Sequence, residues 1–333
     1  MRTTTRRPRR FRGLLLAAVG LLLALGCIEG LLRIADPFHY ADDDMVQRFA
    51  LELRDTREIS PALSSFYLRP NAHIEFLGQT FDVNERGYRT PLVPYEKAED
   101  VYRIVVVGDS VPFGWGIAEK DCFPRRLETL LNQREKPFGR KRVEVVNLSG
   151  PGRGLGDYLI VLQHEAMKYH PDRVIVPLIF NDIPLMEVIP PEERPAPAPQ
   201  LPSWLHGVWT ARLFHILYLR IAGYEMTGDY WLGIRSSPKA LSAFPIAFAS
   251  FKAAAAGTPI LLFDTIGEEP GHGVKEIADA AEATGLDRIE CFLRLSEWPS
   301  KWAIRAPKHN HPNPAAHDHY AHVLFDWFAA HGL

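Results

Sequence analysis

The sequence predicts an α/β protein, a three-layer α/β/α doubly wound parallel sheet, preceded by a membrane-anchoring helix. The first observation is "VYRIVVVG" at residues 101–108, a continuous β-branched run of the kind that a fully buried parallel strand shows. The second is that similar runs alternate with helical segments along the chain, as in doubly wound folds. The third is a long apolar run near the N-terminus.

The predicted strands and helices follow one another in a regular order. After "VYRIVVVG" come the helical "DCFPRRLETLLNQRE", the strand "KRVEVVNL", the helical "LGDYLIVLQHEAMKYH", and the strands "DRVIVPLIF" and "TPILLF". The last helix is "HDHYAHVLFDWFAAH", where Tyr320, Val323, Leu324 and Phe328 mark a core-facing stripe.

We expect three regions along the chain. Residues 1–35 form a basic tail and anchor, residues 36–100 a β-rich lead-in with many turn signals, and residues 101–333 the α/β domain. A Pro-rich stretch and the aromatic helical segment "SWLHGVWTARLFHILYLRIAGY" interrupt this domain at about residues 184–243, which we interpret as an insertion.

The N-terminus has the composition of a membrane-targeting segment. Six arginines and no acidic residue precede the uncharged run from Gly13 to Ile28. Glu29 and Arg33 stand one helical turn apart and can pair, so a span from Gly13 to Ala35 is predicted. The arginines would hold the N-terminus in the cytoplasm and place the rest of the chain outside it. A cleaved signal peptide and a lipoprotein with a lipidated Cys27 are the alternatives.

The charge balance bears on nucleic-acid binding, and the cysteine content bears on disulfide pairing. Without the six N-terminal arginines, 32 basic side chains face 40 acidic ones, which argues against a nucleic-acid partner. Cys122 and Cys291 can pair or remain small buried side chains, and the sequence leaves this open.

Candidate site residues follow three predicted strands, where ligands bind in open parallel sheets. Ser110 lies in "GDSVPFGWG" after the first strand, Gly152 in "NLSGPGRG" after the second, and Asn181 in "FNDIP" after the third. Pro112 stands where the α/β-hydrolase elbow needs glycine, so that motif is absent. Asp109 is interpreted as a turn residue that forms hydrogen bonds.

Together with "HPN" near the C-terminus, these blocks resemble the SGNH/GDSL hydrolase superfamily in residue type and order. "NERGYRTP" at residues 84–91 is similar to the opening segment of its membrane-anchored bacterial members. The resemblance implies a flavodoxin-like fold, Ser110 as nucleophile and His311 as base. It further implies an oxyanion hole from the backbone N–H groups of Ser110 and Gly152 and the side-chain amide of Asn181.

The histidine-rich end of the chain allows other interpretations. Spacings such as His309-x-His311 and His317-x-His319 are found in metal sites, but only Asp318 is at hand to complete one, and no metal or cofactor is predicted. A neutral imidazole can remove the serine proton at neutral pH, which favours His311 as the base. His319 and His322 are expected to be solvated.

One departure from the resembled family concerns the acid that orients the histidine. Members commonly carry Asp three or two residues before it, where this chain has Lys308 and His309. A backbone carbonyl or Glu297 could hold the His311 ring, or the site could act as a Ser-His dyad.

The sequence therefore predicts a membrane-anchored, extracytoplasmic serine hydrolase of carboxylic esters. From location alone, O-acetyl groups on extracytoplasmic polysaccharide are the expected substrates. An O-acyltransferase using the same Ser110 and His311, with residues 204–224 as a lid or acceptor groove, is one alternative. A catalytically inactive, anchored glycan-binding protein is the other.

Overall fold

The computed structural model describes residues 8–37, 44, 49, 52–53, 68–179, 182, 199–223, 241–265, 274–291, 293, 295–306 and 311–332. The chain divides into two compact units. One comprises residues 1–44 and 195–227, and the other residues 45–194 and 228–333.

The larger unit is built on a five-stranded parallel sheet with the order β4-β3-β5-β6-β7. Counted from β3, this is the 2-1-3-4-5 order of flavodoxin-like doubly wound folds, so the predicted fold class is confirmed. The strands are β3 (Val101–Val106), β4 (Arg142–Asn147), β5 (Arg173–Leu178), β6 (Ile260–Asp264) and β7 (Asp287–Glu290).

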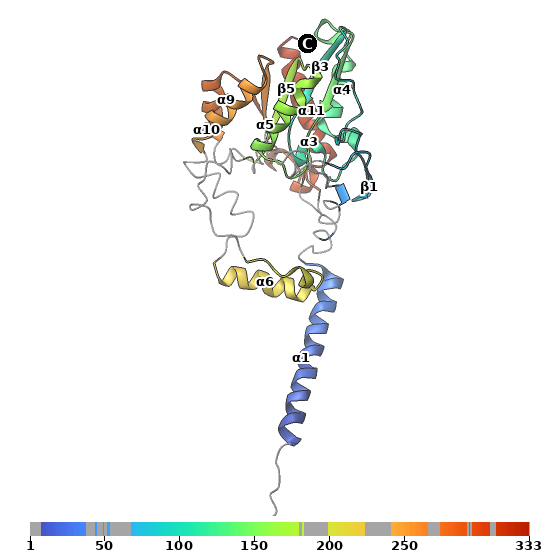
Figure 1. Ribbon diagram of the computed structural model, residues 1–333, viewed down its shortest axis with the longest axis vertical. Coiled ribbons are helices and arrows are strands. Elements are labelled where there is room, and N and C mark those ends of the chain that lie inside the picture. Colours follow the sequence, from blue (N-terminus) through green and yellow to red (C-terminus); the bar gives the residue numbers. More distant parts are fainter. Residues whose placement is uncertain are drawn as a thin grey trace, which may run out of the picture. The chain divides into compact units, whose positions relative to one another are not determined.

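Helices cover both faces of this sheet because alternate strand residues point to opposite sides. Val105 and Val107 pack in one core with helices α5 (Leu155–His164), α9 (Phe244–Ala254) and α10 (Val274–Thr284). Ile104 and Val106 pack in the other with α4 (Phe123–Asn132) and α11 (Pro314–Ala330). Figure 1 shows the sheet between these two sets of helices.

Short 3-10 helices also belong to this unit. They are η1 (Glu119–Asp121), η2 (Pro137–Gly139), η3 (Ala166–Tyr169), η7 (Leu295–Glu297) and η8 (Lys301–Ala303). The segment predicted as one helix at 155–170 is divided between α5 and η3, and the last helix begins at Pro314, earlier than its apolar stripe indicates.

The described part of the lead-in contains an antiparallel hairpin. Strands β1 (His73–Phe76) and β2 (Gln79–Asp82) pair through the register Ile74 with Phe81. Their aromatic side chains form a separate core with Phe113 and Trp115, which follow Ser110 in the chain. Most of residues 36–67 lies outside the described part.

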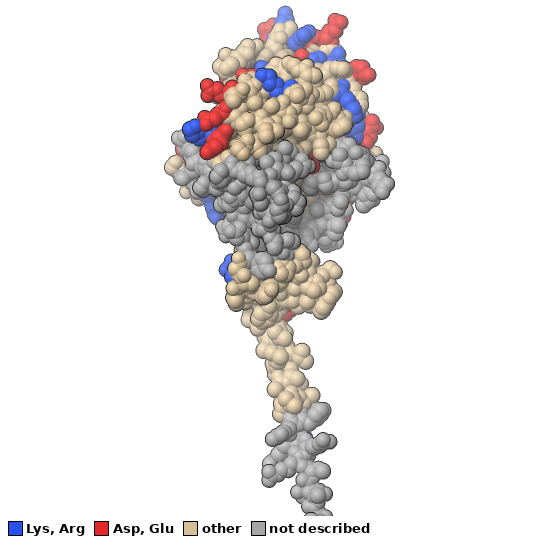
Figure 2. All heavy atoms as spheres, turned by 60° about the vertical axis from the view of Figure 1, so that its left-hand side comes forward, with Lys and Arg blue, Asp and Glu red and all other residues tan. Residues whose placement is uncertain are grey.

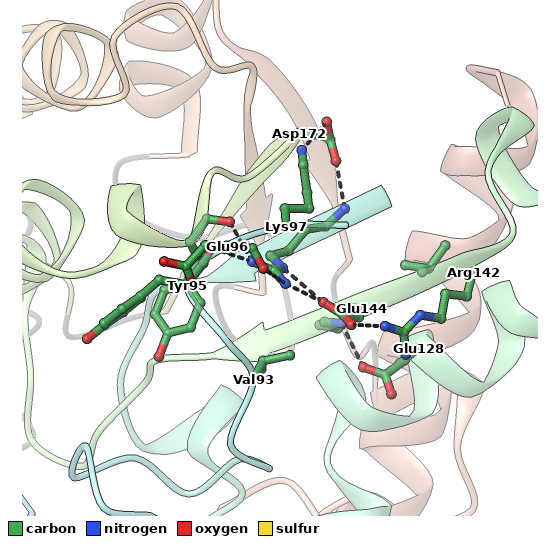
Figure 3. A network of polar contacts seen from close by, with 12 residues as sticks. Val93, Tyr95, Glu96, Lys97, Glu128, Arg142, Glu144 and Asp172 are labelled. Carbon is green, nitrogen blue, oxygen red and sulfur yellow. Dashed lines mark hydrogen bonds and ion pairs between the residues drawn. The ribbon is translucent and has the colours of Figure 1, made fainter. Parts of the chain in front are cut away.

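A polar network fastens residues 93–97 to the sheet near the start of its strands (Figure 3). Arg103 on β3 is buried and donates to Glu144 Oε2 at 2.7 Å and to the carbonyl of Tyr95 at 2.9 Å. Asp172 accepts from the backbone N–H of Arg103 at 2.7 Å and from Lys97 Nζ at 2.6 Å. Ser110 follows the opposite end of β3, so this network is a scaffold.

The smaller unit consists of helix α1 (Pro8–Ala35), the 3-10 helix η6 (Ser203–Leu205) and helix α6 (Trp209–Ile221). Within α1, Arg12–Ala35 contains an 18-residue window with a mean hydropathy of 2.3, and its 24 residues are long and apolar enough to cross a membrane. Glu29 and Arg33 form the predicted ion pair at 2.7 Å. In the view of Figure 2, this unit shows few Lys, Arg, Asp or Glu side chains.

Candidate active site

Ser110 is the first residue of the four-residue helix α3 (Ser110–Phe113), which begins shortly after β3. Asp109 caps this helix by accepting a hydrogen bond from the backbone N–H of Val111 at 2.9 Å. Gly108 must be glycine, because a Cβ there would meet Pro112 Cγ at 2.5 Å. The turn therefore places the Ser110 side chain beyond the carboxyl end of a central strand.

His311 lies next to Ser110, with 3.0 Å between His311 Nε2 and Ser110 Oγ. The histidine loop is held by backbone pairing, since Ala306 N–H donates to the His311 carbonyl at 2.9 Å. Asn313 fixes the other side of the loop by donating to the Ala303 carbonyl at 3.0 Å and by capping α11. Two residues that the sequence proposed as nucleophile and base are thus brought within hydrogen-bond distance.

Asp109 is a second acceptor for the Ser110 hydroxyl, with 3.2 Å between Asp109 Oδ2 and Ser110 Oγ. The Asp109 side chain is buried, and this burial raises its pKa from 3.8 to about 7, although N–H and hydroxyl donors oppose the shift. The structure therefore bears out the interpretation of Asp109 as a capping and hydrogen-bonding residue.

The loop after β4 lies beside the Ser110 turn. Gly150 N–H donates to the Gly108 carbonyl at 3.0 Å, and Asn147 Nδ2 donates to the Pro112 carbonyl at 2.7 Å. Gly152, further along this loop, is exposed and has a φ of 74°, a conformation that favours glycine. Asn181 lies outside the described residues, so the complete oxyanion hole stays a prediction.

Sequence reasoning missed two residues that support the site. Trp115 is buried, and its ring centroid lies 5.9 Å from that of His311. Arg89 is buried beneath the turn and donates to the carbonyls of Gly114 and Ile117, each at 2.8 Å, and of Phe113 at 3.2 Å. Arg89 belongs to the "NERGYRTP" segment, but a buried arginine is not expected from a polar loop sequence.

The other described histidines near the C-terminus lie in different environments. His317 is buried and accepts from the backbone N–H of Phe123, which sets it in the core of the α4 and α11 face. His322 is exposed as expected, whereas His319 is half-buried near Trp298. Among the described side chains, no group of three His, Cys, Asp or Glu residues could hold a metal ion.

The acid that would orient His311 is not identified by the described contacts. Lys308 and His309 lie outside the described residues, and Glu297 is an exposed residue at the end of η7. Cys122 and Cys291 are both free and buried, so they do not pair.

Comparison with protein-family models and with curated proteins finds no match. Similar solved structures include a lipase/acylhydrolase from Enterococcus faecalis, at 15% identity and a TM-score of 0.42, covering 69% of this chain and 96% of that one. An α/β hydrolase enzyme from the metagenome of Lake Arreo is 16% identical, with a TM-score of 0.43 and coverages of 71% and 97%. A mutant acetyl-xylooligosaccharide esterase from Geobacillus is 13% identical, with a TM-score of 0.42 and coverages of 68% and 94%.

Proposed function

We propose that this chain is a serine hydrolase of the SGNH type that cleaves carboxylic esters through an acyl-enzyme. The observation that carries the proposal is the 3.0 Å contact between Ser110 Oγ and His311 Nε2 beyond the carboxyl end of β3. A serine hydroxyl in contact with an imidazole is the arrangement that nucleophilic acyl transfer requires.

The reaction follows from the two groups. His311 Nε2 takes the hydroxyl proton as Ser110 Oγ attacks the ester carbonyl, and the imidazolium then gives this proton to the leaving alcohol. Water, deprotonated by the same nitrogen, hydrolyses the acyl-enzyme and restores Ser110. The backbone N–H groups of Ser110 and Gly152 and the amide of Asn181 are the proposed donors to the oxyanion, and each such donor contributes ~3 kcal/mol in related chemistry.

The proposed location is a membrane that α1 crosses once, with the catalytic domain on the extracytoplasmic side. The length and hydropathy of Arg12–Ala35 and the six preceding arginines support this orientation. Acetyl esters on extracytoplasmic polysaccharide are the proposed substrates, because they are acyl groups within reach on that side. A reporter fused after Leu333 that is active only in the cytoplasm would contradict the orientation.

An activated ester tests the activity. Purified full-length protein in detergent micelles is incubated with 4-nitrophenyl acetate, with and without a soluble polysaccharide acceptor, beside the Ser110→Ala variant. Hydrolysis without acceptor that the variant lacks supports the esterase. Turnover only with acceptor would identify an O-acyltransferase, and equal rates in both proteins would contradict catalysis by Ser110.

A further inference from the structure

Helix α6 begins against the outer part of α1, at a carboxylate that caps it from another helix. Glu29 accepts from the backbone N–H groups of Trp209 at 3.2 Å and Thr210 at 2.8 Å, and from the Thr210 hydroxyl at 2.8 Å. The two backbone N–H groups are among those that a helix N-terminus leaves unsatisfied. Glu29 thus fixes where α6 starts along α1.

Arg33 completes this junction. Its guanidinium pairs with Glu29, donates to the carbonyl of Gly207 at 2.6 Å and lies over the Trp209 ring at 5.1 Å. Leu32 and Trp209 are buried together beside it. The two charges that end the apolar run of α1 therefore serve to dock α6.

One side of α6 faces away from the apolar part of α1. Arg212 pairs with Asp44 at 2.7 Å, and Asp44 follows the end of α1 at Ala35. If α1 crosses a bilayer with its N-terminus in the cytoplasm, Asp44 lies on the extracytoplasmic side. The Arg212 side of α6 then points to that aqueous compartment.

The opposite side of α6 is apolar and exposed. At 100° per residue, four large side chains lie within about 60° of the point opposite Arg212. They are Phe214 (52% exposed), Leu217 (42%), Tyr218 (52%) and Ile221 (87%). A helix in water normally turns such a face inward, so this face needs another apolar environment.

We propose that this face of α6 lies in the outer headgroup and acyl boundary of the same bilayer that α1 crosses, as an in-plane second anchor. The inference rests on the membrane location proposed for α1, and it does not depend on the catalytic role of Ser110. The apolar surface of α1 continues to this level, since Leu31 and Ile34 are also exposed. Trp204, exposed just before α6, is a residue type that favours the membrane interface.

Lipid quenching of a single label tests the proposal. Full-length protein with Cys27→Ser is reconstituted in vesicles of phosphatidylcholine and phosphatidylglycerol, and an environment-sensitive fluorophore is attached to one introduced cysteine. Ile221→Cys tests the α6 face, and Arg220→Cys is a neighbour about 100° round the helix. Leu22→Cys, within α1, and Lys141→Cys, on the surface of the α/β unit, are the positive and negative controls.

Cys122 and Cys291 are buried, so the labels report the introduced positions. With lipids brominated near the headgroup end of their acyl chains, we expect the Ile221 label to lose at least half its fluorescence, and with lipids brominated near the ends of their acyl chains we expect the same of the Leu22 label. The Arg220 label should lose less, and the Lys141 label almost none.

Three results would overturn the proposal. Equal quenching at Ile221 and Lys141, with strong quenching at Leu22, would place α6 in water. A blue-shifted Ile221 label without lipid quenching would show protein, such as a second copy, on this face. Absence of quenching at Leu22 would show that α1 does not cross the membrane. Ester hydrolysis measured on the same samples tests the proposed function separately.

Discussion

The buried side chain of His317 accepts a hydrogen bond from the backbone N–H of Phe123 through Nδ1, at 3.1 Å. A histidine that accepts a hydrogen bond through Nδ1 carries its proton on Nε2, and its ring is therefore neutral. Burial, followed by the charge of Arg126, lowers the pKa of His317 from 6.5 to about 3. Below about pH 6.5 the unfolded chain binds a proton here and the folded chain does not, so His317 makes the fold less stable as pH falls.

Asp109 has the opposite effect on how stability depends on pH. Because its pKa rises from 3.8 to about 7 on folding, the folded chain holds a proton that the unfolded chain has lost. Its contribution to the free energy of unfolding therefore falls as pH rises from about 4 to 7. Between pH 5 and 7 the two residues oppose each other.

We expect single substitutions to separate these opposing effects. The measured quantity is the free energy of urea unfolding at pH 7 minus that at pH 5. His317→Gln should lower this difference relative to the wild type, and Asp109→Asn should raise it, each by roughly 2 kcal/mol. The same difference in all three proteins would show that neither group titrates as its burial indicates.

Fluorophosphonate labelling tests the nucleophile. The wild type should be labelled and Ser110→Ala should not, because the probe reacts with a serine hydroxyl that a base activates. Ser149→Ala is the matched control, since Ser149 is buried in the neighbouring loop and should leave labelling unchanged. Equal labelling of Ser110→Ala and the wild type would rule out the assigned nucleophile.

Arg89→Met should destabilise the protein and disturb the serine turn. It removes a buried donor from the carbonyls of Phe113, Gly114 and Ile117, at about 1–3 kcal/mol for each group left unsatisfied. We expect a loss of about 3–5 kcal/mol in urea unfolding and a lower kcat on an activated ester. Arg142→Met, at an exposed arginine, should change stability by less than about 0.5 kcal/mol, and a similar result for Arg89→Met would contradict its role.

The residue that orients His311 can be identified from kcat on one activated ester. If the site acts as a dyad, Lys308→Asp should raise kcat by about tenfold, because loss of a triad acid costs up to ~10⁴. If Glu297 already serves, Glu297→Gln should lower kcat and Lys308→Asp should bring no gain. Full activity in His311→Ala would contradict the assignment of the base.

The sequence predicted β3, β4, β5 and β6, four of the five strands of the sheet, because each is rich in apolar residues. It did not indicate β7, whose four residues "DRIE" are short and mostly charged, as suits an edge strand. The sequence also did not indicate the division between α5 and η3, because Glu165 leaves the helical conformation there, with φ −132° and ψ −52°, and the residue pattern does not reveal this.

The sequence likewise predicted some residues of the candidate site and not others. Ser110 and His311 stand in recognisable motifs after a strand and before a helix. Arg89 and Trp115 act through contacts between the hairpin and the serine turn, which no local pattern encodes. The residues around His317 in the sequence do not distinguish it from a solvated histidine. The packing of α11 against α4 buries it.

Ser110 and His311 are in contact although 201 residues separate them in the sequence. The order in which the chain is synthesised therefore affects when activity can appear. The nucleophile and its helix are made long before the segment that carries the base. Contacts of such sequence separation form late and slow the folding of a domain. A nascent or C-terminally truncated chain therefore carries a serine that has no base, and we expect esterase activity to emerge only after the final helix packs.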